Sequence, residues 1–288
     1  MQTFNPDPSG SPGAWSAQQI RARSRWRSIQ KLIGDDQLVR CWRGSYSTPQ
    51  ASQLIRLTAL QEAIGGQLIA CHQTAASLHG FGVLDDGLLH VIAPDSRSLR
   101  PRQGVVLHQW HPRTPMTRIE GFLVTSAADT AIDVSCSAQE IDQLAVLDAA
   151  LRAGTTRVEL SESLERAKGR RGIRTVKHWT AFADAAAESP MESRTRFRAL
   201  AAGLPAPELQ IQVDVPGGSR WLDMGWRHKL VGLEYDGVEF HSGDGRLARD
   251  RRRHNEILRA GWTLVYATAP DIWRQPGPLI AQLRELIG

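Results

Sequence analysis

The chain has 288 residues, of which 41% are apolar and 23% charged, and this length suits two or three small globular domains. No stretch approaches the roughly 18 uninterrupted apolar residues of a membrane-spanning helix, and the N-terminus lacks the basic and apolar regions of a secretory signal. Three scattered cysteines without C-x-x-C spacing argue against a disulfide framework and against a zinc site. We therefore expect a cytoplasmic protein that does not contact a membrane.

The net charge of +5 is concentrated in two places. Residues 15–47 hold seven basic side chains against two acidic ones, and residues 246–259 hold six against two. Such concentrations are typical of surfaces that face phosphate groups, although either one alone fits a solvated helix face equally well.

The first 48 residues read as a flexible tail over 1–13 followed by a winged helix-turn-helix over 14–48. Ser16 is placed to cap a short first helix, and a second helix is predicted from Ser24 to Gly34 by apolar residues at three- and four-residue spacing. Residues 38–46 then predict two short strands around a basic turn. In such a module the second helix enters the major groove of duplex DNA. The expected DNA contacts are Arg25, Arg27, Lys31, Arg40 and Arg43.

Residues 49–155 predict a mixed α/β domain, with helices at 51–64, 75–79 and 141–152 and strands at 89–93 and 104–108. Its candidate site residues are His72 with His79 and His108 with His111. Because no carboxylate or cysteine falls at ligand spacing beside them, we interpret them as surface or core histidines. Residues 156–187 then predict a basic helical linker.

The last hundred residues, 188–288, carry the pattern with chemical content. Ser189 caps a helix that runs to Gly203 and has Glu192 in its first turn. Residues 220–226 and 230–236 predict a hairpin. If its turn is centred on residues 228 and 229, then Asp223 lies opposite Glu234, with Cβ atoms roughly 5 Å apart, and Asp236 shares that face.

Facing carboxylates repel each other, so this arrangement predicts a site for a divalent cation, Mg²⁺ or Mn²⁺. The alternative, in which the acids form no functional site, is a solvent-exposed acidic hairpin. A register error of one residue would place the two acids on opposite faces and remove the prediction.

These residues resemble a known family. The runs S-P-M-E at 189–192, W-L-D at 221–223, L-E-Y-D-G-x-x-x-H at 233–241 and R-D-x-x-R at 249–253 are similar to PD-(D/E)XK nucleases, in the branch related to very-short-patch-repair endonucleases. The resemblance implies a restriction-endonuclease-like α/β domain with Asp223 and Glu234 as metal-binding acids and Glu192 as a supporting acid. It implies further site or DNA-facing residues at His241, Asp250 and Arg253, beside the basic Arg249 and Arg252. Asp236 stands where the general motif has a lysine.

The first half resembles AbiEi-type antitoxins, which are winged-helix transcriptional autorepressors. The resemblance covers roughly residues 14–155 and is carried by the wing at 37–46, by H-Q-T-A-A-x-x-H-G at 72–80 and by V-T-S at 124–126. It implies duplex DNA as a partner and a cognate toxin as a second partner.

Two functions therefore stay open for this α/β chain of several domains. The first is a DNA-recruited, metal-dependent endonuclease. The second is an AbiEi-like antitoxin or transcriptional regulator that keeps an inactive nuclease fold for binding DNA or a partner. The sequence leaves the oligomeric state open.

Overall fold

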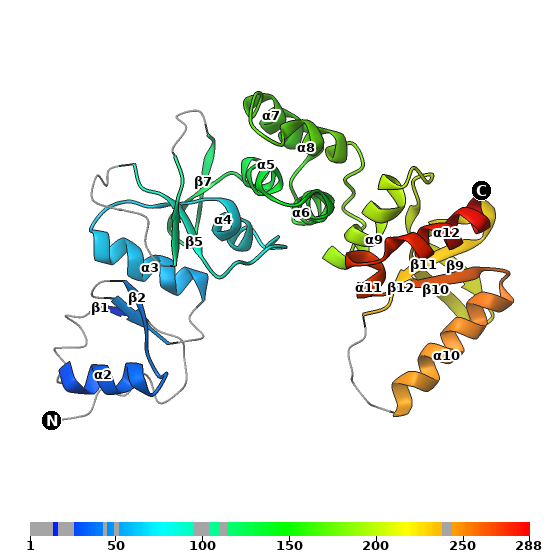
Figure 1. Cartoon of the computed structure of the whole chain (residues 1–288), viewed down its shortest axis with the longest axis horizontal. Coiled ribbons are helices and arrows are strands. Elements are labelled where there is room, and N and C mark those ends of the chain that lie inside the picture. The colour runs from blue at the N-terminus through cyan, green and yellow to red at the C-terminus, as the bar shows by residue number, and fades with distance from the viewer. Residues whose placement is uncertain are drawn as a thin grey trace. The chain divides into compact units, whose positions relative to one another are not determined.

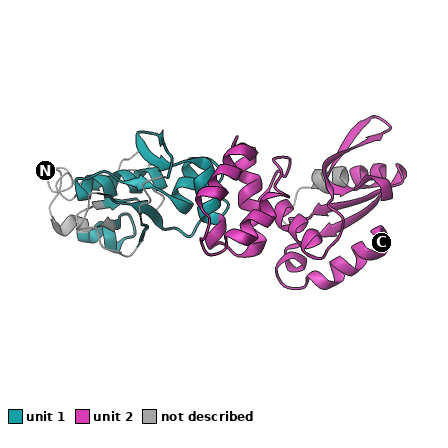
Figure 2. Ribbon diagram, turned by 90° about the horizontal axis from the view of Figure 1, so that it is seen from above, with its two compact units in different colours: residues 1–134 teal, residues 135–288 magenta. Residues whose placement is uncertain are grey.

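A computed structural model describes residues 14–16, 26–42, 45–48, 52–94, 104–109, 114–237 and 244–288. The fold is mixed α/β, as the sequence predicts, with three separate sheets and helices packed on them (Figure 1). The chain divides into two compact units, residues 1–134 and residues 135–288 (Figure 2). Within the described ranges, no helix is long and apolar enough to cross a membrane.

The N-terminal segment is a three-stranded antiparallel sheet with one described helix. Its elements are β1 (Ala14–Ser16), α2 (Trp26–Gly34), β2 (Val39–Trp42) and β3 (Ser45–Ser47). The strand order is β1-β3-β2, so the predicted hairpin over 38–46 is confirmed.

The predicted helix cap at Ser16 is wrong, because Ser16 ends strand β1 and pairs with Ser45. Trp15, its neighbour, lies opposite Tyr46 and packs on the small core around Leu38. Burial of these large side chains outweighs the local capping preference of a serine, which is worth only about 1 kcal/mol.

The second sheet has the strand order β6-β5-β4-β8-β7 and is covered by two helices. The elements are α3 (Gln53–Ile64), β4 (Ile69–Ala70), α4 (His72–Leu78), β5 (Leu89–Ile92), β6 (Val105–Leu107), β7 (Met116–Ile119) and β8 (Phe122–Thr125). Helix α3 begins at a capping side chain, since Ser52 accepts a hydrogen bond from the Ile55 amide, and it ends at Gly65 with φ of 61°.

Four helices connect this sheet to the C-terminal one. They are α5 (Ala127–Ser137), α6 (Glu140–Arg152), α7 (Arg157–Arg166) and α8 (Ile173–Thr180). A reciprocal capping box fixes the start of α7, with Thr156 and Glu159 each bonding the backbone of the other.

The C-terminal sheet has the order β12-β11-β10-β9, with β11 and β12 parallel and the other pairs antiparallel. Its elements are α9 (Pro190–Ala201), β9 (Glu208–Val215), β10 (Gly218–Trp226), a 3-10 turn (Arg227–Lys229), β11 (Val231–Tyr235), α10 (Asp244–Arg259), β12 (Thr263–Ala267), α11 (Ala269–Trp273) and α12 (Pro276–Ile287). Helix α10 packs on the core of one face through Ile257, and α9 packs against β10 and β11 (Figure 1).

The predicted register of the β10–β11 hairpin is confirmed. Met224 pairs with Leu233 and Trp226 with Val231, and this register places Asp223 opposite Glu234, one position beyond the last paired residues. Close approach of the two strands requires glycine at position 225, because a Cβ atom there would lie 2.3 Å from a backbone oxygen of β11.

Buried ion pairs join α6 to α9. Arg196 donates from Nη2 to both carboxylate oxygens of Asp148 at 2.7 Å, and Arg194 donates from Nε to Asp142 at 2.8 Å. Burial raises the pKa of the Asp148 carboxyl even though Arg196 opposes that shift. These contacts fix the helix that carries Glu192.

Candidate functional site

Three carboxylates from three elements meet at the C-terminal sheet. Ser189 accepts a hydrogen bond from the Glu192 amide at 3.1 Å and so fixes the first turn of α9. Asp223 and Glu234 come from the facing strands β10 and β11. Burial, together with the nearby carboxylates of Glu192 and Glu234, raises the pKa of Asp223 to about 6 against the opposing effects of the Tyr235 amide and Arg253. The juxtaposition of acids predicted from the sequence is therefore present.

Arg253 of α10 is bound within this cluster. Its Nη1 donates to Oε2 of Glu234 at 3.0 Å and its Nη2 donates to Oε1 at 2.5 Å, while Nη2 also reaches the Trp221 carbonyl at 2.5 Å. Glu234 is only 6% exposed, so the guanidinium balances a buried charge. Hydrogen bonding to Glu234 raises the pKa of Arg253, which stays a cation.

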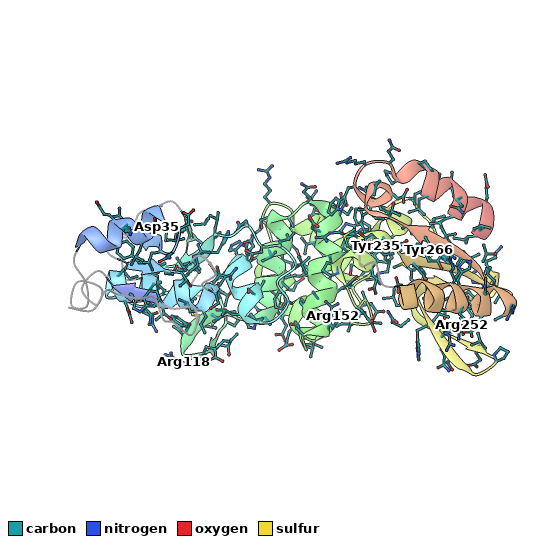
Figure 3. The ribbon with its side chains drawn as sticks, turned by 90° about the horizontal axis from the view of Figure 1, so that it is seen from below. Asp35, Arg118, Arg152, Tyr235, Arg252 and Tyr266 are labelled. Atoms are coloured by element: carbon teal, nitrogen blue, oxygen red, sulfur yellow. The ribbon has the colours of Figure 1, made fainter. Side chains whose placement is uncertain are left out.

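Of the other predicted site residues, Asp236 and Arg252 can be described with their side chains. The backbone amide of Tyr235 donates to Oδ2 of Asp223 at 3.0 Å, and Asp236 follows as an exposed residue. Arg252 is exposed on α10 (Figure 3). His241 lies outside the described residues, as do the side chains of Arg249 and Asp250.

A pocket of about 780 Å³ opens beside the carboxylates. It lies where β11 ends and where α10 faces the edge strand β12, and its polar lining includes Asp223, Asp236, Arg251, Asn255 and Tyr266. Tyr235 and Tyr266 lie at this end of the sheet (Figure 3). The sequence predicted the acids of this pocket and did not predict its tyrosines or Asn255.

The donor chemistry of the cluster fits a divalent cation in kind, because Mg²⁺ and Mn²⁺ prefer carboxylate oxygens. The geometry of the cluster, by contrast, does not suit a divalent cation. Both oxygens of Glu234 are bound by Arg253, and among the residues that the structure describes no group of three or more histidine, cysteine, aspartate or glutamate side chains is placed to hold a metal ion.

Two of the five predicted DNA contacts at the N-terminus can be located with their side chains. Lys31 is exposed in the last turn of α2, and Arg40 is exposed on β2. Arg25 and Arg43 lie outside the described residues, and so does the side chain of Arg27.

The middle sheet holds a histidine cluster that sequence reasoning missed. His90 is hydrogen-bonded through Nε2 to Asp86 and through Nδ1 to Nε2 of His108, both at 2.9 Å, and His72 stacks on His108 with ring centroids 3.8 Å apart. Hydrogen bonds from the Leu88 amide and from His90 outweigh burial and lower the pKa of Asp86. The spacing of Asp86 and His90, four residues apart, was the signal available.

A loop thus brings Asp86 to His90, a contact that the spacing of the predicted histidines did not indicate. His79 lies at a separate contact, 2.7 Å from the Thr125 carbonyl, and burial lowers its pKa. His111 is outside the described residues.

Comparison with known proteins identifies relatives of the whole chain and a known domain that its middle part resembles. Residues 68–181 match the AbiEi antitoxin C-terminal domain. The chain is 37% identical over 248 residues to the uncharacterized protein Rv2248 of Mycobacterium tuberculosis strain H37Rv, an alignment that covers 85% of this chain and 91% of that protein. The uncharacterized protein MT2308 of strain CDC 1551 matches with the same identity and coverage. The chain thus belongs to one family with these mycobacterial proteins, and its middle part is similar to the C-terminal domain of AbiEi antitoxins.

Proposed function

We propose that the chain is a DNA-binding regulator of the AbiEi antitoxin type, with a cognate toxin as its protein partner. The observation that carries the proposal is the match of residues 68–181 to the AbiEi antitoxin C-terminal domain. That stretch contains the second sheet and the helices from α5 to α8, so the likeness extends over a continuous part of the fold.

The segment that precedes this domain in the chain has features that favour contact with duplex DNA. A helix followed by a hairpin has the element order of a winged helix-turn-helix. Lys31 of that helix and Arg40 of that hairpin are both exposed basic residues. Such cations bind phosphates and release counterions, so this contact is sensitive to salt and tolerant of sequence.

A gel-shift titration on duplex DNA tests this proposal. Lys31→Ala and Arg40→Ala should each weaken binding by a similar factor on all sequences and lower the salt slope by about 1. Arg118→Ala removes an exposed arginine from β7 of the middle sheet and serves as the matched control. Unchanged affinity in both N-terminal variants would contradict the proposed interface.

The toxin partner is tested separately by co-expression. Growth inhibition by the cognate toxin should be relieved by the full chain, as expected of an antitoxin. Relief by a chain that lacks residues 68–181 would place that activity outside the matched domain and contradict the proposal.

The crowded carboxylates favour a second candidate, metal-dependent hydrolysis of phosphodiester bonds. In that function Asp223 and Glu234 would hold Mg²⁺ or Mn²⁺, with Glu192 and Asp236 nearby, and Arg253 would have to release Glu234 first. The raised pKa of Asp223, about 6, supports a functional cluster because such shifts concentrate at functional sites. A bound cation of this kind supplies charge stabilisation to a phosphodiester.

A plasmid nicking assay in Mn²⁺ and in Mg²⁺ decides between the two candidates. Cleavage that needs metal and is lost in Asp223→Asn and Glu234→Gln, yet persists in Asp214→Asn, would establish the nuclease. Asp214 is an exposed carboxylate on β9 and therefore a matched control. Absence of cleavage in every DNA form, together with a shifted mobility on duplex DNA, would support the regulator alone.

A further inference from the structure

We propose that the pocket beside the carboxylates binds one unpaired nucleotide of single-stranded nucleic acid and prefers a base that carries an exocyclic amino group. The proposal goes beyond the proposed contact with duplex DNA and does not depend on it, because it involves a different surface from the N-terminal helix and hairpin.

The topology builds a crevice at this place. Strands β11 and β12 are parallel and are connected through α10, and ligands of such β-α-β units bind beyond the carboxyl ends of the strands. The pocket begins where β11 ends, at Tyr235 and Asp236. Its volume of about 780 Å³ is in the range of small-molecule sites and suits a single nucleotide rather than a duplex.

An oriented aromatic ring borders the crevice. Tyr266 of β12 is 40% exposed, although its hydroxyl is held by Nδ1 of His254 at 2.8 Å. The two rings lie 5.8 Å apart with an interplanar angle of 29°, so His254 holds the Tyr266 ring in one orientation. A ring that is fixed before binding loses little side-chain entropy when a base stacks on it.

The charges inside the pocket favour a base over a free phosphate. Three carboxylates, from Asp223, Glu234 and Asp236, face two guanidinium groups, from Arg251 and Arg253. Arg253 is already bound to Glu234, so the remaining interior is a poor site for an anion.

The same polar groups can recognise the edge of a base. The exposed carboxylate of Asp236 accepts hydrogen bonds from an amino group, as aspartate does with the N4 amino group of cytosine. Asn255 lines the pocket and offers both a donor and an acceptor. Arg251 and Arg252 are exposed on α10, where they can contact the phosphates on either side of the inserted nucleotide.

Fluorescence anisotropy with the full chain and labelled oligonucleotides of about 12 nucleotides, a length within known site sizes, tests this assignment. Oligo(dC) and oligo(dT) are compared, because the two pyrimidines have similar size and differ in the amino group. We expect oligo(dC) to bind at least about 10-fold more tightly, since a hydrogen bond to a charged acceptor distinguishes them. Asp236→Ala should abolish that preference.

Tyr266→Ala should weaken oligo(dC) binding by about 5- to 150-fold, the range for loss of one stacking ring. Trp273→Ala removes a similarly exposed aromatic side chain of α11 that does not line the pocket, and it should leave binding unchanged. Equal binding of oligo(dC) and oligo(dT), or full affinity in Tyr266→Ala, overturns the proposal.

Arg40→Ala separates this proposal from the proposed regulator. It should weaken duplex binding and leave oligo(dC) binding intact. If the chain fails to bind duplex DNA while its Tyr266-dependent binding of oligo(dC) persists, the regulator is wrong and the nucleotide pocket stands. If duplex binding depends on Arg40 and oligo(dC) does not bind, the pocket assignment is overturned and the regulator stands.

Discussion

Replacement of Asp223 by asparagine should stabilise the protein at neutral pH. The carboxyl has a pKa of about 6 in the fold against an ordinary 3.8, so its ionised form is disfavoured by burial and by the two neighbouring carboxylates. That difference corresponds to about 3 kcal/mol above pH 6, and partial solvent screening lowers the expected value to about 1–3 kcal/mol. Asparagine is neutral and can still accept the hydrogen bond from the Tyr235 amide.

The sign follows from proton binding. Because the folded state binds the proton more tightly than the unfolded state, the aspartate protein loses stability as the pH rises from about 4 to about 6. The advantage of Asp223→Asn should therefore be about 0.5 kcal/mol or less at pH 4 and reach its full size above pH 6.

Urea unfolding at several pH values, followed by tryptophan fluorescence, measures this difference, with Asp214→Asn as the control for an exposed carboxylate. A variant that is less stable than the parent at neutral pH would refute the reasoning. An advantage that does not depend on pH would refute it as well, since it would have to come from packing.

Two further substitutions test the frame around the site. Asp148→Ala leaves the buried Arg196 without its partner and should lower the free energy of unfolding by about 3–5 kcal/mol, as measured by thermal unfolding. Glu162→Ala, the control at an exposed ion pair, should lower it by less than about 1 kcal/mol. Equal effects of the two substitutions would contradict the role of the α6–α9 contact. Gly225→Ala places a Cβ atom 2.3 Å from a backbone oxygen of β11 and should strongly reduce the yield of folded protein, while Gly277→Ala, which has open space around it, should be tolerated; normal circular dichroism of Gly225→Ala would show that the strands can separate.

Local chemistry made the acids predictable. A serine followed by a proline marks the start of α9, and alternating side chains with a short turn leave few registers for the β10–β11 hairpin, so Asp223 and Glu234 could be placed opposite each other from the sequence. The mixed α/β class follows in the same way, from the alternation of helical and strand patterns.

Contacts between distant elements could not be predicted in this way. Arg253 was expected at the site or its DNA-facing rim, but its bidentate pairing with Glu234 depends on how α10 packs across the sheet. Likewise, His90 and His108 meet because β5 and β6 pair in parallel, and no local pattern specifies that pairing. Ser16 shows the opposite failure, since a favourable local signal lost to burial of the neighbouring Trp15.

Helix α9 contributes both to the carboxylate cluster and to the contact with α6. Its first turn carries Glu192 to the carboxylate cluster, and the next residues, Arg194 and Arg196, are bound to α6 by buried ion pairs. These three side chains belong to one continuous helix, so Glu192 cannot move far without moving Arg194 and Arg196 as well. A partner that shifted α6 would have to break two buried ion pairs or displace Glu192 from its place beside Asp223, so α9 couples the position of α6 to the carboxylate cluster.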